Sequence, residues 1–401
     1  MTIPSNNISL DEISSEVLDP TSSNVSLNSI FKRFLIGNTT LNSQIQMSSF
    51  ANLTASVGWI STAVGNTNSN TAILKTVRPT TNTYANYAQQ SSVLVLGNTY
   101  SAMTNDGTYL AIWDNLSTTT VRLYSRSGGT WTLQSSLLLS GTYTGTQNCG
   151  AWDSTGTYLA LSYGPDVTGT TAVFAAVLKR TGNTLSQLSV PTTSTFPTTG
   201  AMFPLWVAWS PDGATLSVWS DTPSTSQNAL MRYSRSGDTL TALSLLATGN
   251  VPASGSQFFG FGYNPDGSKA ICSWFGTAIR TFTYTISGTT WGRSDPGSTV
   301  AAEAINITWD PAGLTVFGQN SSGATQIWTV SGTTYTRLSA LAGSSFYGAY
   351  CDTAYYAANG STIRQVQGSG SSWTLSNNLN GSLDTNQSVW SASKKSVPGS
   401  P

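Results

Sequence analysis

The sequence contains no histidine and very little glutamate. Histidine is the usual base in nucleophilic catalysis and a common metal ligand, so its absence excludes most catalytic triads and most zinc mechanisms. Glutamate occurs only as Glu12, Glu16 and Glu303. The only cysteines are Cys149, Cys272 and Cys351. Their wide, uneven spacing fits no metal site, and buried thiols are a simpler interpretation than a disulfide framework. We therefore expect no cofactor and no bound metal.

Charge is scarce as well. Charged residues make up 8% of the chain, and 17 basic residues balance 17 acidic ones. A nucleic-acid binder needs a concentrated basic face, and none is visible, so we expect no nucleic-acid partner. The apolar runs are too short to span a membrane, and the N-terminus lacks a signal-peptide pattern. We therefore expect neither membrane insertion nor export.

Aromatic residues are present in normal number. Trp, Tyr and Phe make up 10% of the chain and recur at regular intervals. A disordered chain lacks such large apolar side chains, which offset the entropy lost on folding. The sequence therefore predicts a folded protein despite its low charge.

A unit of about forty to fifty-five residues recurs, as in repeat architectures. Each unit begins with an apolar strand followed by an Asp-x-x-Gly-type turn, in which the Asp side chain caps the turn and the Gly accepts a positive φ. The turns are Asn105-Asp106-Gly107, Asp153-Ser154-Thr155-Gly156, Pro211-Asp212-Gly213, Pro265-Asp266-Gly267 and Asp310-Pro311-Ala312-Gly313. We interpret these recurring aspartates as turn-forming residues and not as catalytic ones.

Each unit ends in a hairpin closed by Ser-Gly or Thr-Gly, which is a hairpin signal between alternating strands. Residues 124–131 and 233–240 are nearly identical copies. Six units begin near residues 99, 147, 203, 257, 302 and 345. A seventh, without the Asp turn, covers residues 57–88. Residues 387–392 echo residues 57–61, so one of these two segments could close a ring between the first and last units.

This pattern resembles the WD40-like β-propellers with Asp-x-x-Gly turns, over roughly residues 57–381. It departs from true WD40 repeats, because it has no Gly-His pair. The resemblance implies an all-β fold, a seven-bladed β-propeller of four-stranded antiparallel blades. We assign residues 57–392 to the propeller and 393–401 to a C-terminal tail. Six tryptophans are expected to wedge between blades: Trp113, Trp152, Trp209, Trp219, Trp274 and Trp309.

Residues 1–56 follow a different rule and are predicted to form small strand and helix turns. A six-residue pattern of apolar residues occurs three times, and a brief amphipathic helix follows the second copy. The apolar residues of the segment are Ile8, Leu10, Ile13, Val25, Leu27, Ile30, Phe31, Phe34, Ile45, Met47 and Phe50. This pattern resembles a motif found near the ends of bacteriophage virion proteins of the tail and fibre type. The resemblance implies a docking segment.

From that resemblance we expect a non-enzymatic virion structural protein, assembled in the host cytoplasm and tail-associated, in multiple copies per virion. Its partners would be other virion proteins and a host-surface glycan or receptor. A capsid decoration protein is the alternative location. A cellular scaffold propeller unrelated to phage also remains open.

Long polar loops in three units contain groups that could bind a glycan: Asp114, Tyr163, Asp166 and Asp221. Solvated loops explain these residues equally well. A carbohydrate-active enzyme acting on host surface polymers is a further alternative. It would need two carboxylates about 5–10 Å apart, for which Glu303 and Asp352 are the candidates.

Overall fold

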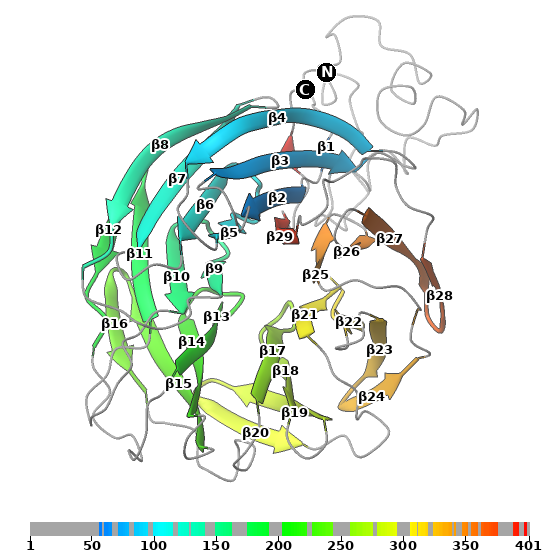
Figure 1. The fold of residues 1–401 in the computed structure, drawn as a ribbon. Helices are drawn as coiled ribbons and strands as arrows, with labels where there is room; N and C mark the ends of the chain where they lie inside the picture. Colours follow the sequence, from blue (N-terminus) through cyan, green and yellow to red (C-terminus); the bar gives the residue numbers. More distant parts are fainter. Residues whose placement is uncertain are drawn as a thin grey trace, which may run out of the picture.

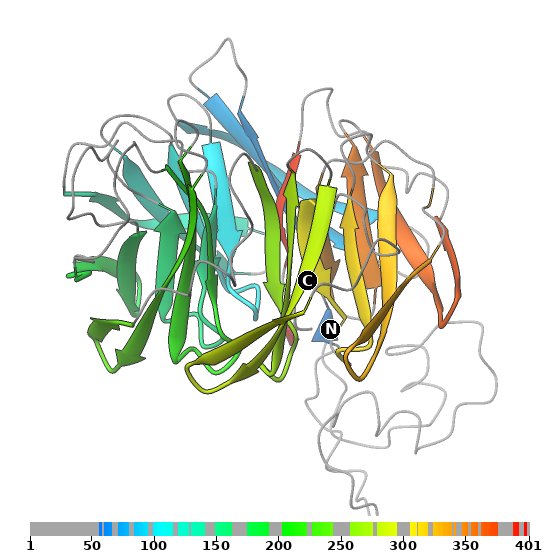
Figure 2. The same ribbon diagram turned by 90° about the horizontal axis from the view of Figure 1, so that it is seen from below.

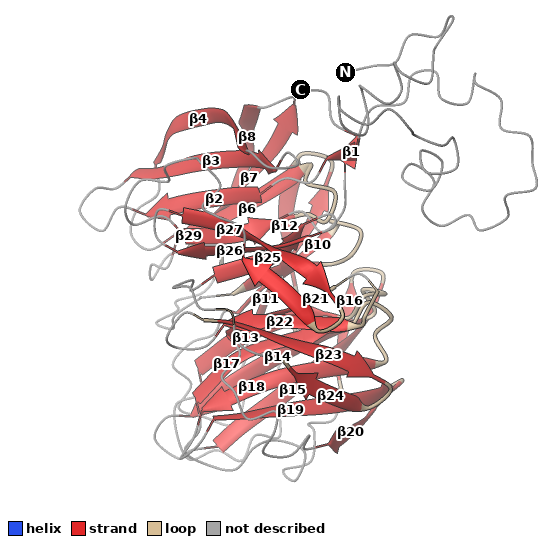
Figure 3. Cartoon of the chain, turned by 90° about the vertical axis from the view of Figure 1, so that its right-hand side faces the viewer, coloured by secondary structure: helices blue, strands red, loops and turns tan. Residues whose placement is uncertain are grey.

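The computed structural model forms a ring of β-sheets around a central axis (Figure 1). It describes residues 56–57, 60–65, 71–79, 84–94, 99–114, 119–127, 130–140, 149–162, 175–191, 203–222, 227–243, 257–275, 279–294, 305–310, 312–319, 324–338, 341, 347–351, 354–359, 362–375, 388–392 and 397–398. The regular elements in this part of the chain are strands (Figure 3).

Seven four-stranded antiparallel sheets make up the ring, which confirms the predicted seven-bladed β-propeller. We number the blades in chain order. Blade 1 contains, from the axis outward, β29 (Ser388–Ala392), β2 (Ile60–Gly65), β3 (Thr71–Pro79) and β4 (Tyr84–Leu94). Blade 2 contains β5 (Thr99–Met103), β6 (Tyr109–Asp114), β7 (Thr120–Ser127) and β8 (Thr130–Leu138). Blade 3 contains β9 (Gly150–Trp152), β10 (Tyr158–Ser162), β11 (Ala175–Thr181) and β12 (Thr184–Leu188).

The other four blades repeat this order. Blade 4 contains β13 (Phe203–Trp209), β14 (Thr215–Thr222), β15 (Gln227–Ser236) and β16 (Thr239–Ala242). Blade 5 contains β17 (Gln257–Tyr263), β18 (Lys269–Phe275), β19 (Ile279–Ser287) and β20 (Thr290–Ser294). Blade 6 contains β21 (Ile305–Trp309), β22 (Thr315–Gln319), β23 (Thr325–Ser331) and β24 (Thr334–Arg337). Blade 7 contains β25 (Tyr347–Cys351), β26 (Ala354–Asn359), β27 (Thr362–Ser369) and β28 (Ser372–Leu375).

The ring has two faces, which Figure 2 shows edge-on. We call the turn face the side on which the first strand of a blade turns into the second and the third turns into the fourth. The loop face is the opposite side, where second strands end and third strands begin. Each inner strand therefore runs from the loop face to the turn face.

An early strand and a late strand of the described chain pair and close the ring. Strand β29, from the end of the sequence, pairs with β2 from Ile60↔Ala392 to Ala63↔Ser388. This pairing confirms the hypothesis that one of the two similar segments closes the ring, and it identifies β29 as the closing strand. A second pairing joins β1 (Ser56–Val57) to β30 (Val397–Pro398).

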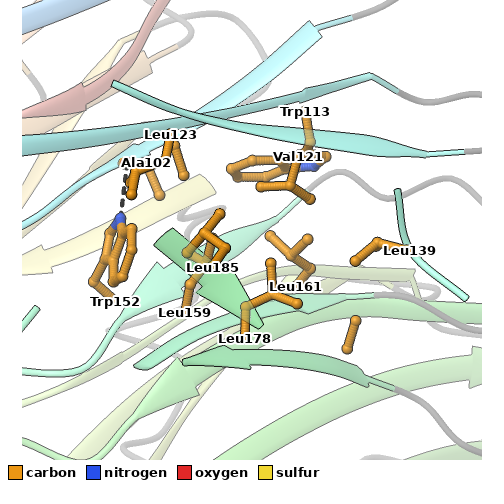
Figure 4. Close-up of a cluster of buried hydrophobic side chains, with 12 residues drawn as sticks. Ala102, Trp113, Val121, Leu123, Leu139, Trp152, Leu159, Leu161, Leu178 and Leu185 are labelled. Atoms are coloured by element: carbon orange, nitrogen blue, oxygen red, sulfur yellow. Dashed lines mark hydrogen bonds between the residues drawn. The ribbon is translucent and has the colours of Figure 1, made fainter. Parts of the chain in front are cut away.

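The core lies between the blades. Alternate residues of a strand point to opposite faces of its sheet, so each blade packs one set against the blade before it and the other against the blade after it. Blades 2 and 3 enclose Trp113, Trp152, Leu159 and Leu178, and the Nε1–H of Trp152 donates to the carbonyl of Ala102, 3.0 Å away (Figure 4). Trp209, Trp219 and Trp309 occupy three further interblade clusters, as predicted. The side chain of Trp274 lies outside the described part.

Candidate active site

The turn between the first and second strands is held by a repeated pair of hydrogen bonds. In blade 3, Asp153 Oδ1 accepts from the backbone N–H of Thr157 at 2.8 Å and of Tyr158 at 3.0 Å. Asp310 caps the corresponding turn of blade 6 in the same way, with both distances 2.7 Å. These two aspartates therefore act as turn caps, as the sequence predicts.

In blades 2, 4 and 5, two side chains together accept the backbone hydrogen bonds of the turn that a single aspartate accepts in blades 3 and 6. In blade 4, Ser210 Oγ accepts from the N–H of Thr215 at 2.9 Å and donates to Asp212. Asp212 Oδ1 in turn accepts from the N–H of Ala214 at 2.9 Å. The corresponding pairs in blades 2 and 5 are Thr104 with Asp106 and Asn264 with Asp266. The glycine that ends the blade 4 turn, Gly213, has a φ of 69°, which a residue with a Cβ adopts only with strain.

Arginines fasten the turns of adjacent blades together. Arg180 Nε donates to the carbonyl of its own turn glycine at 2.8 Å, and its guanidinium lies 4.0 Å from the ring centre of Tyr109 in the preceding blade. Arg235 repeats both contacts in the next blade, at 2.9 Å and with the ring of Tyr158 at 4.1 Å. The position is aliphatic in blades 5 and 6, where it is taken by Ile286 and Val330.

Asp238, the remaining acidic residue of the turn face whose contacts are described, also binds neighbouring side chains. Asp238 accepts from the Tyr158 hydroxyl at 2.7 Å and forms an ion pair with Lys179 at 2.6 Å. All the acids whose side chains are described are thus bound in turns or between blades: Asp106, Asp153, Asp212, Asp238, Asp266 and Asp310. The described carboxylates of the turn face are therefore committed to structural hydrogen bonds.

The hydrogen bonds of the turn carboxylates stabilise the fold at neutral pH and are weakened when acid protonates these groups. Hydrogen bonds from Ser210 and Ala214 lower the pKa of Asp212 below its ordinary value of 3.8, and hydrogen bonds from Ser268 do the same for the pKa of Asp266. A lowered folded-state pKa stabilises the fold above the unfolded pKa, and this contribution disappears as the pH falls through the folded value. We therefore expect the midpoint temperature of thermal unfolding to decrease once the pH drops below about 3.8.

Thermal unfolding followed by circular dichroism from pH 5 to pH 2 (roughly the span that brackets these carboxylates) tests this expectation. The double variant Asp212→Asn/Asp266→Asn should have a lower midpoint temperature than the wild type at pH 5. Its midpoint should also decrease less than that of the wild type when the pH is lowered to 2. A wild-type-like pH profile in this variant would contradict the assignment.

Two predicted binding residues lie at matching places on the loop face. Asp114 is the last residue of β6 and pairs with Thr99, the first residue of the inner strand of blade 2. Asp221 lies near the end of β14 and pairs with Phe203, the first residue of the inner strand of blade 4. Strand direction therefore places both aspartates at the end of the ring opposite the Asp turns. Tyr163 and Asp166 lie outside the described residues.

The inner strands differ from blade to blade at this end. The pairing of first and second strands is regular in blades 2, 3 and 7. In blades 4, 5 and 6 it shifts register near the start of the inner strand, between Pro204 and Trp206, between Phe258 and Gly260, and between Ile305 and Thr308. The pairing of the inner strand β29 with β2 in blade 1 shifts in the same way, opposite Ser61 and Thr62. Such β-bulges re-aim side chains and are over-represented beside active sites. The sequence did not indicate them, although the aromatic starts of the units near residues 203 and 257 were visible.

The remaining predictions fall on other parts of the chain. The docking segment with its apolar residues, and both Glu303 and Asp352, lie outside the described residues.

The described residues hold neither a cluster of metal-binding side chains nor a membrane-spanning helix. No group of three or more Cys, Asp and Glu side chains there is placed to hold a metal ion. No helix in the same part of the chain has the length and apolar character needed to cross a membrane.

Comparison with known proteins shows the fold. No protein-family model and no curated protein sequence matches the chain. Among solved structures, one from Bacteroides uniformis, assigned as a 6-phosphogluconolactonase, has a TM-score of 0.60 at 15% identity and covers 82% of this chain and 97% of its own. A protein from Lactobacillus plantarum has a TM-score of 0.63 at 14% identity, over 84% and 98% of the two chains. A periplasmic gluconolactonase from Pseudomonas aeruginosa has a TM-score of 0.61 at 12% identity, over 83% and 98%.

These structures overturn the prediction of a non-enzymatic virion structural protein. Two of these three propellers are named as lactonases, and no family model or curated sequence matches the chain to support a virion protein. The physical reason for the error is that the absence of histidine excludes only mechanisms that need an imidazole. Carboxylates also activate water, and a propeller with few charges still has them at its strand ends.

Proposed function

We propose that this chain is a hydrolase that opens a sugar-acid lactone on its loop face. The observation that carries the proposal is the position of Asp114 and Asp221 at strand ends of that face, while the described acids of the turn face are engaged in structural hydrogen bonds. The fold shared with two lactonases over 82% and 83% of the chain supports it. Of the alternatives raised by the sequence, this is closest to the carbohydrate-active enzyme.

The chemistry needs one base and a water molecule. The carboxylate takes a proton from water while the water oxygen bonds to the lactone carbonyl carbon. The ring C–O bond then breaks, and the ring oxygen leaves as a hydroxyl after it receives that proton. The product is the open-chain sugar acid. In a chain without histidine, an aspartate is the natural group for this proton transfer.

Proton release from glucono-δ-lactone, corrected for spontaneous opening in buffer, tests the proposal. The wild-type chain should accelerate it, and Asp→Asn at whichever of Asp114 and Asp221 is the base should lower kcat by about 10²- to 10⁴-fold. Asp238→Asn is the matched control, because it makes the same chemical change on the turn face. A wild-type rate equal to that of buffer, or full activity in both loop-face variants, would refute the proposal.

A further inference from the structure

We infer that the outer strand of blade 2, β8, is the interface through which two copies of this chain form a dimer. β8 has nine residues and lies at the outer rim of the ring (Figure 1), where it pairs with β7 and with no other described strand. A strand at the edge of a sheet presents backbone N–H and C=O groups with which a further strand can pair. Dimer formation through this edge does not depend on the proposed lactonase activity.

β8 lacks the features that keep edge strands from pairing, which are short length, charged residues and proline. The outer strands of blades 3 to 7 have four or five residues each, and two of them carry an arginine, Arg293 in β20 and Arg337 in β24. β8 is nine residues long and contains neither a charged residue nor a proline. β4 of blade 1 is also long, but its side chains lie outside the described part.

Two exposed leucines lie on one face of β8. Leu133 is 49% exposed and Leu138 is 61% exposed. They are an odd number of positions apart, which in a regular strand would place them on opposite faces. The pairing of β7 with β8 skips Gln134, however, and the β7 partners of the two leucines, Tyr124 and Thr120, are an even number of positions apart. Both leucines therefore lie on the same face.

This face points away from the core between blades 2 and 3. Leu137 lies on the opposite face of β8 and packs against that core. Leu133 and Leu138 do not contribute to it and remain exposed. Large apolar side chains that stay in contact with water gain free energy when another surface covers them.

A second copy of the chain matches this arrangement. Two identical edge strands can pair antiparallel across a two-fold axis perpendicular to the sheet, which keeps the same face of each on the same side. An axis near Ser136 places Leu133 of one copy opposite Leu138 of the other, and the symmetry forms the same pair again on the other side of the axis. Both leucines of both copies are then covered by cross-strand contacts. Arg122 pairs with Ser136, but it lies on β7, one strand removed from the joined edge.

Mass measurement with matched variants tests the interface. Light scattering coupled to size-exclusion chromatography should give twice the chain mass of 42.2 kDa, and the dimer should dissociate on dilution. The double variant Leu133→Lys/Leu138→Lys should raise the dissociation constant by at least about tenfold, because it takes charges into the joined sheet. Leu314→Lys is the control, since it makes the same change at a leucine that is 60% exposed on the turn face. Thermal unfolding of these variants verifies that they are folded.

A cross-link tests the position of the axis. Ser136 is exposed, and directly opposite residues of antiparallel strands are close enough for a disulfide. Oxidation of Ser136→Cys with diamide should therefore give a covalent dimer on a non-reducing gel. Ser186→Cys is the control, because Ser186 is exposed on β12, the short outer strand of blade 3.

Three results would overturn the interface. The first is a wild-type chain that is monomeric at every concentration tested. The second is a dimer that persists unchanged in Leu133→Lys/Leu138→Lys, because its interface would then lie elsewhere. The third is a monomeric wild type whose midpoint temperature falls in this double variant, which would show that another segment of the same chain covers the two leucines.

Discussion

Removal of residues 387–401 should cause the largest loss of stability of any short truncation. The deletion takes away β29, which is the inner strand of blade 1 and also contacts β25 of blade 7 and β5 of blade 2. Without it, the inner edge of β2 loses its hydrogen-bonding partner and the ring is open between its first and last blades. We expect the thermal midpoint to fall by at least about 10 °C, since the loss combines backbone pairing with interblade packing.

Two measurements check this expectation. Circular dichroism melts give the midpoint, and size-exclusion chromatography reports whether the opened ring expands. A shorter truncation that removes only residues 393–401 keeps β29 and, among the described strand pairings, loses the two-residue pairing of β30 with β1, so it serves as the control. Equal midpoints for the two truncations would show that the closing strand contributes little.

The second large effect is expected at the contact between Gly150 and Trp113. Trp113 is fully buried between blades 2 and 3, and a Cβ added to Gly150 would overlap its ring and lie 2.8 Å from Leu161 Cδ2. Close packing around a buried indole leaves it little room to move away. Trp113→Ala should therefore cost about 3–5 kcal/mol through the cavity it leaves, and Gly150→Ala about 1–3 kcal/mol through overpacking.

A double-mutant cycle measured by urea unfolding isolates the contact. In a Trp113→Leu background the smaller side chain leaves room for the new methyl group, so Gly150→Ala should become nearly neutral or stabilising. Gly292→Ala is the control, because a Cβ there would meet only one atom, at 3.9 Å. Additive effects of Trp113→Leu and Gly150→Ala would contradict the predicted contact.

Some of the site could be predicted from the sequence, and some could not. Asp114 and Asp221 were identifiable because each follows an apolar second strand, so the strand direction decides at which face it lies. The bulges of blades 4, 5 and 6 could not be predicted, because a register shift depends on how two strands pair and not on either strand alone. The virion function was wrong because it depended on a short N-terminal motif, and a fold or motif alone does not specify chemistry.

The sequence by itself determined the repeat, the turns and the number of blades. These features are local: Asp153 caps backbone groups four and five residues away, and the hairpin glycines need only their own positive φ. Even the closing strand was indicated, because residues 387–392 match the first blade. Only the tertiary structure decided between which blades an arginine packs on a tyrosine ring. It also decided how Trp113 packs against Gly150 and where the inner strands bulge. Such contacts join residues far apart in the chain, as in the bond from Tyr158 to Asp238 across 80 positions, and packing selects them only when neighbouring blades meet.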